Sequence, residues 1–233
     1  MYKKEYFFRY SDIDCCEKIK ISTIIDILQD ISILHSANAG YPRDTLVSMS
    51  IAWLLLGWRI KFISPIDKNL PIEVSTGIMS VQKFEAQRKY EIHQNGECKV
   101  IATAVWFTVN LKEMKIIRPP EEIYMSYENI TEPDNRLEFT RLRPKKLKNS
   151  IGSFNVERRD IDTNKHMNNV RSVEAALDFL PESVDIKELW VTYRRSLHAN
   201  ENISVFAEQS DKKYFIELVN SAGESGVLLK IIL

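Results

Sequence analysis

The apolar positions of the chain follow two patterns of helical spacing. Between residues 22 and 39, apolar side chains recur three and four positions apart, as on one face of an α-helix, and Gly40 suits the helix end. Residues 170–180 show the same spacing, with Asn168 or Asn169 in place to cap the first turn. The sequence therefore predicts a long helix in the first half of the chain and a shorter one in the second.

Most other stretches are rich in β-branched and aromatic residues, which predicts strands. Residues 41–50 are an exception, because they contain Pro42 and no clear period, and we expect a loop or lid there. Each half then has a strand, a helix and about four more strands. The predicted strands are 2–10, 51–66, 70–81, 84–93, 99–111, 153–158, 187–195, 203–208, 214–220 and 226–233.

The order of elements repeats, and the two copies are separated by a polar stretch. Asp12-Ile13-Asp14 matches Asp160-Ile161-Asp162 at an offset of 148 positions. We therefore expect an N-terminal domain at 1–117, a linker at 118–149 and a C-terminal domain at 150–233, each domain an α+β unit.

Three polar residues lead into the second predicted helix. Asp162, Asn164 and His166 occupy alternate positions, so in an extended segment they would face one side, next to a helix N-terminus that favours negative charge. This set could activate water and hold an oxyanion. The alternative, favoured by residue types alone, is a turn with a surface histidine. The first copy has Cys16 and Lys18 at the matching positions, so we expect one site per chain.

Composition narrows the classes of function. The 233 residues are 44% hydrophobic, and 32 basic residues balance 32 acidic ones, which argues against a general nucleic-acid binder. No apolar run is long enough for a signal peptide or a membrane span. Three cysteines and four scattered histidines give no disulfide framework and no zinc spacing. We expect a cytoplasmic protein with no metal and no other cofactor.

With the repeat and the Asp-x-Asn-x-His-x-Asn-Asn segment in view, the chain resembles the acyl-ACP thioesterase family, the bacterial relatives of the plant plastid enzymes. The resemblance implies a tandem hot-dog fold, in which each half is an antiparallel sheet wrapped around a long central helix. It also implies hydrolysis of the thioester of fatty acyl-acyl carrier protein, which releases the fatty acid and ends chain elongation. The catalytic residues it implies are Asp162, Asn164 and His166. Other segments that carry it are Leu28-Gln29-Asp30, Trp58-Arg59-Ile60, Arg118-Pro119-Pro120 and Tyr193-Arg194-Arg195.

One position departs from the family pattern. Tyr-Arg-Arg is usually followed by a glutamate that is the proposed water-activating base, and this chain has Ser196 there. Glu174 or Glu201 could supply a carboxylate, or both could be ordinary exposed acids. The departure leaves open a non-hydrolytic acyl-binding protein. A hot-dog hydratase or an acyl-CoA thioesterase fits the whole-length resemblance less well.

The resemblance also implies a partner, an acyl carrier protein that carries a fatty acyl chain. That protein is acidic, so a basic patch would help it to dock. We expect no nucleic-acid or membrane partner, and either a monomer or a homodimer, because a tandem chain already pairs its two halves. The candidate docking residues are Arg158, Arg159, Arg171, Arg194 and Arg195, or the basic run within 141–148.

Overall fold

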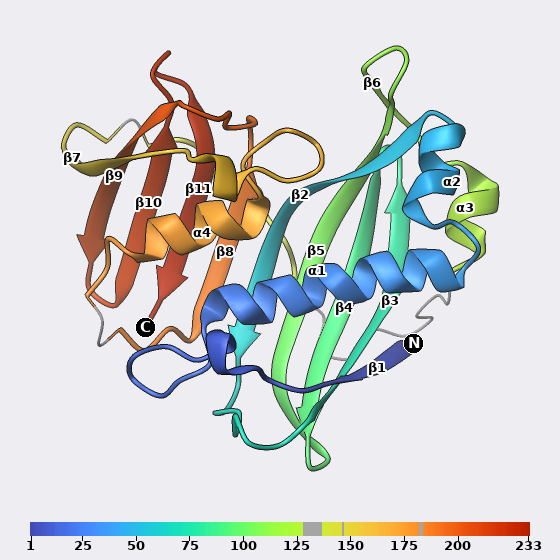
Figure 1. The fold of residues 1–233 in the computed structure, drawn as a ribbon, viewed down its shortest axis with the longest axis horizontal. Helices are drawn as coiled ribbons and strands as arrows, with labels where there is room; N and C mark the ends of the chain where they lie inside the picture. Colours follow the sequence, from blue (N-terminus) through green and yellow to red (C-terminus); the bar gives the residue numbers. More distant parts are fainter. Residues whose placement is uncertain (128–136, 146, 182–183) are drawn as a thin grey trace. The chain divides into compact units, whose positions relative to one another are not determined.

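The computed structural model describes residues 1–127, 137–145, 147–181 and 184–233 (Figure 1). The chain forms two compact units, Met1–Phe139 and Thr140–Leu233. Within the described ranges, none of the helices has the length and apolar character needed to cross a membrane.

The first unit is one antiparallel sheet with a long helix across one face (Figure 1). The strand order is β1-β3-β4-β5-β2, and the short β6 pairs with β5. Helix α1 buries Ile25, Leu28 and Ile31 completely, which gives this unit its core. The elements are β1 (Tyr2–Tyr6), the 3₁₀ helix η1 (Tyr10–Asp12), α1 (Ile21–Asn38), α2 (Arg43–Ser48), β2 (Ile51–Phe62), β3 (Ile72–Gln82), β4 (Glu85–Gln94), β5 (Glu97–Asn110), β6 (Lys115–Ile117) and α3 (Glu121–Met125).

The second unit repeats this arrangement with a shorter helix. Its strand order, β7-β9-β10-β11-β8, matches that of the first unit strand for strand. Helix α4 buries Val170, Val173 and Ala176, one stripe of its apolar face. The elements are β7 (Ser150–Asn155), the 3₁₀ helix η2 (Arg158–Asp160), α4 (Asn169–Leu177), β8 (Glu188–Tyr193), β9 (Asn202–Ser210), β10 (Lys213–Val219) and β11 (Ser225–Ile232). The predicted α+β class is confirmed.

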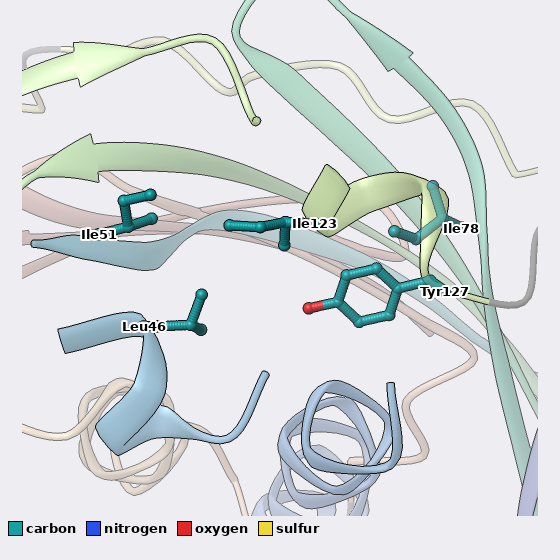
Figure 2. Packing of buried hydrophobic residues seen from close by; sticks show 5 residues of the cluster. All are labelled: Leu46, Ile51, Ile78, Ile123 and Tyr127. Atoms are coloured by element: carbon teal, nitrogen blue, oxygen red, sulfur yellow. The ribbon is translucent and has the colours of Figure 1, made fainter. Parts of the chain in front are cut away.

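The prediction of a loop at 41–50 is wrong, because the segment contains α2. Figure 2 shows Leu46 of α2 in a cluster of buried residues with Ile51, Ile78, Ile123 and Tyr127. The helices α2 and α3 are too short to produce a helical period in the sequence, and long-range packing of single apolar side chains stabilises them instead.

Part of the polar stretch assigned to a linker packs into the first unit. Ile123 and Tyr127 are buried there, although both fall within the predicted linker 118–149. Residues 128–136 and 146 lie outside the described part. The predicted boundaries of the two domains and their linker stay predictions.

Candidate active site

The segment that carries the three polar residues is a tight turn and not an extended strand, which corrects the prediction. Its ends are joined by a bridge between Ile161 and Met167, and the Asp162 N–H donates to the His166 carbonyl at 2.9 Å. Lys165 takes a left-handed conformation, with φ of 64°, to close the turn. Aspartate and asparagine favour such turns, which is the physical reason that alternation in sequence did not give an extended segment.

The structure brings Asp162 and Asn164 together. The Asp162 carboxylate accepts the backbone N–H of Asn164 at 2.7 Å and lies 3.4 Å from its side-chain amide nitrogen. Asp162 is half-buried and Asn164 is exposed. The aspartate therefore holds the asparagine in one orientation, in which the amide oxygen takes no part in these bonds.

His166 contacts a residue that sequence reasoning missed. Its ring lies edge-on to the ring of His198, with centroids 4.9 Å apart and planes at 83°. No hydrogen bond joins the His166 ring to Asp162 or Asn164 among the described residues. His198 follows β8, far from the motif in sequence, and only the pairing of strands brings it near. No local signal in the sequence indicated this contact.

Helix α4 starts directly after the turn. The Asn168 side chain accepts the Val170 N–H at 2.7 Å, which confirms one of the two predicted caps. The Asn168 N–H donates to the Asp160 carbonyl at 2.8 Å, so the turn and the first helical turn are tied together. Met167 is buried between them. The N-terminus of α4, which follows the turn, carries a partial positive charge that favours negative charge nearby.

The first unit contains the same turn at an offset of 148 residues. Ile13 bridges Ile19, the Asp14 N–H donates to the Lys18 carbonyl at 2.8 Å, and Glu17 has φ of 63°. Asp14 accepts the backbone N–H groups of both Cys16 and Lys18. The predicted repeat is thus visible in the backbone hydrogen bonds. The second turn has Asn164 and His166 where the first has Cys16 and Lys18, and among the described residues the bond from the Lys18 N–H to Asp14 has no counterpart at His166.

The segment around Ser196, where the family pattern has a glutamate, lies next to the motif. The Leu197 carbonyl accepts the Met167 N–H at 2.7 Å, and the Leu197 side chain packs over Gly226, where a Cβ would lie 2.5 Å from it. Ser196 itself is exposed. Glu201 accepts the His198 N–H through its carboxylate at 3.0 Å.

Glu174 lies in a different environment. It forms an ion pair with Arg171 on the wall of a cavity of about 500 Å³ between β7, η2 and α4. Asp178, on the same wall, has its pKa raised by partial burial and by the charge of Glu174. None of the three motif residues lines this cavity. The other residues that line the cavity are Phe154, Asn155, Arg159, Asp160, Met167, Ala175 and Phe179.

Several of the basic residues expected to dock the carrier protein form ion pairs with acidic residues of the same unit. Arg159 pairs with Glu157 at 3.2 Å, and Arg195 pairs with Glu224 at 2.9 Å. In the predicted basic run, Lys145 pairs with Glu208 at 2.7 Å, and Lys146 lies outside the described residues. Within the described part, no group of three His, Cys, Asp or Glu side chains is placed to hold a metal ion.

Comparison with known families identifies both halves of the chain. Residues 1–127 match the acyl-ACP thioesterase N-terminal domain, and residues 143–230 match the acyl-ACP thioesterase C-terminal domain. The chain belongs to the acyl-ACP thioesterase family. The members of this family are thioester hydrolases with the hot-dog type of fold, so the resemblance drawn from the motif is confirmed at the level of the family.

Individual relatives are distant in sequence and close in fold. The oleoyl-acyl carrier protein thioesterase 2 of Arabidopsis thaliana is 21% identical over an alignment of 247 residues, gaps included. The alignment covers 96% of this chain and 67% of the plant protein. An acyl-ACP thioesterase from Bacteroides thetaiotaomicron superposes with a TM-score of 0.91 at 18% identity, over 99% of this chain and 96% of that one. The 12:0-ACP thioesterase from Umbellularia californica gives 0.84 at 14% identity, over 99% and 96%. The chain spans between 51% and 67% of the lengths of the plant relatives.

Proposed function

We propose that this protein hydrolyses the thioester of a fatty acyl-acyl carrier protein and releases the free fatty acid. The observation that carries the proposal is the polar turn of the second unit, inside a chain whose two halves both match the family. The substrate is a thioester with a developing oxyanion in its transition state. An amide, an imidazole and the positive end of the α4 dipole are suited to that charge.

The roles of the three residues follow from their contacts. Asp162 orients Asn164 through two hydrogen bonds. Asn164, which is exposed, then holds the thioester oxygen or the attacking water with its amide. His166, half-buried at the end of the turn, polarises the carbonyl or passes a proton to the leaving thiol.

The partner in this proposal is an acidic acyl carrier protein that docks close to the turn. Arg158 and Arg194 are exposed on the same unit as the motif, as are Arg159, Arg171 and Arg195 beside their acidic neighbours. Such rim charges mainly raise the association rate and its sensitivity to salt. A cytoplasmic location, and a monomer or a homodimer, remain part of the proposal.

The test is release of free fatty acid from a panel of acyl-ACPs of different chain lengths. We expect turnover by the wild type on at least one chain length. His166→Ala and Asn164→Ala should each lower kcat about a hundredfold or more, because each removes a group that acts on the reacting atoms.

Binding of acyl-ACP, measured in parallel, separates this function from its alternative. Unchanged binding by both variants would show that they lost chemistry and not folding. Absence of turnover on every chain length, with binding retained, would instead identify a non-hydrolytic acyl-binding protein, the alternative raised by Ser196.

A further inference from the structure

The ring of His198 is an imidazole beside the motif that the proposed roles leave unused. It lies edge-on to His166 at 4.9 Å and is otherwise exposed to solvent. It follows Ser196, the position of the expected glutamate, by two residues. A titratable group therefore lies near the place where the family usually has its base.

Backbone contacts on both sides fix the position of His198. On one side, the Leu197 carbonyl accepts the Met167 N–H at 2.7 Å, and Leu197 is only 2% exposed. On the other side, the His198 N–H donates to the Glu201 carboxylate at 3.0 Å, and the Glu201 N–H donates back to the His198 carbonyl at 3.2 Å. These bonds hold the backbone at His198 next to the motif, from where its ring reaches that of His166.

The other candidates for the base are placed less well. Ser196 is exposed, and a serine hydroxyl is not a base at neutral pH. Glu174 pairs with Arg171 on a cavity wall that the motif residues do not share. The Glu201 carboxylate already accepts the His198 N–H.

We propose that His198 is the base that activates the hydrolytic water, in place of the glutamate expected at position 196. This inference rests on the proposed function. A ring nitrogen of His198 takes one proton from water while the water oxygen forms a bond to the thioester carbon. Asn164 and the first turn of α4 stabilise the resulting oxyanion. The carbon–sulfur bond then breaks, the proton passes to the thiolate, and the products are the fatty acid and the free thiol.

The chemistry of imidazole suits this role. A general base is most effective when it titrates near the working pH, and imidazole in model peptides does so at about 6.5. The titratable groups that the contacts place around His198 are His166 across the rings and Glu201 in its own turn.

The experiment compares His198→Ala with a control histidine, His93→Ala, which lies in β4 of the first unit. We expect His198→Ala to lower kcat about a hundredfold with little change in KM, and His93→Ala to keep wild-type kcat. Adding Ser196→Glu to His198→Ala should restore turnover. Because a carboxylate then replaces an imidazole as the base, the pH below which kcat falls should be about two units lower than in the wild type.

The outcomes separate this inference from the proposed function. Wild-type turnover with an unaffected His198→Ala variant would overturn the assignment of His198 and leave the hydrolase intact. Two results for the double variant would also contradict a base at this place. In one, Ser196→Glu does not restore the kcat lost in His198→Ala; in the other, it restores kcat but the pH below which kcat falls stays as in the wild type. No turnover by the wild type would remove the proposed function itself.

Discussion

At the scale of single residues, the first unit contains a buried guanidinium without an acidic partner. Arg88 is 6% exposed, donates to His35 Nδ1 at 2.8 Å and lies over the ring of Tyr127. No carboxylate pairs with it among the described residues. Since arginine has no acceptor, His35 must accept through Nδ1 and carry its proton on Nε2. A buried cation held only by dipoles and a π face is expensive.

This environment predicts unequal effects of substituting the two partners. Arg88→Met removes the charge and keeps an apolar stem, so its effect on the free energy of unfolding should be small, within about 1 kcal/mol. His35→Ala leaves the cation with only its 3.4 Å contact to the Thr76 hydroxyl and should cost about 3 kcal/mol. Urea unfolding of both variants measures the difference. A larger loss for Arg88→Met than for His35→Ala would show that the guanidinium is a net stabiliser.

At the scale of elements, the two units differ where the first strand meets the helix. In the first unit, the Tyr6 hydroxyl of β1 donates to Asp30 of α1 at 3.0 Å. Phe154 and Asp178 stand at the same offset in the second unit, and Phe154 pairs with Ile203 as Tyr6 pairs with Ile72. The phenylalanine cannot donate. The pKa of Asp178 is raised there, by partial burial and by Glu174, beside the cavity.

Restoring the hydroxyl should therefore stabilise the second unit. We expect Phe154→Tyr to raise the free energy of unfolding by up to about 1 kcal/mol at neutral pH, through a hydrogen bond to the Asp178 carboxylate. The bond favours the ionised acid and lowers its pKa relative to wild type. The gain should consequently be present at neutral pH and disappear as the pH falls through the carboxyl range.

Phe84→Tyr, at a position that is 51% exposed, is the matched control. It adds the same hydroxyl without a carboxylate partner and should leave stability unchanged at every pH. Equal gains in the two variants would mean that the effect comes from the hydroxyl alone and not from Asp178.

At the scale of the whole molecule, one chain contains two copies of the turn and one polar set. The Lys18 position matches that of His166, and both residues follow an aspartate that closes the turn. Lys18→Ala should therefore keep wild-type turnover, whereas His166→Ala should remove nearly all of it. Parallel thermal unfolding should show similar stabilities for both. A drop in turnover with Lys18→Ala would indicate that the first turn also takes part.

The elements of this architecture could largely be predicted because each is long enough to show its period. The helices α1 and α4 and nearly all strands of both sheets follow from local spacing and from β-branched content. The helices α2 and α3 could not be predicted, since long-range packing of Leu46 and Ile123 stabilises them.

The candidate site could be predicted only in part, for the same reason. Asp162, Asn164 and His166 are close in sequence, and their residue types indicate a turn before a helix. His198 comes to the site through the pairing of β8 with β11 and through the single bond between Leu197 and Met167. That contact depends on the register of a sheet, which no local pattern specifies.

The paired turns also bear on how such a protein can change over evolutionary time. The bonds that close the turns use backbone groups of these residues. Asp14 accepts the N–H groups of residues 16 and 18, Asp162 accepts the N–H of residue 164, and the Asp162 N–H donates to the carbonyl of residue 166. The residues at 16 and 18, or at 164 and 166, can therefore vary while the backbone keeps its path. A duplicated chain of this kind can lose its chemistry in one copy, or regain it in the other, through a few substitutions that folding does not oppose.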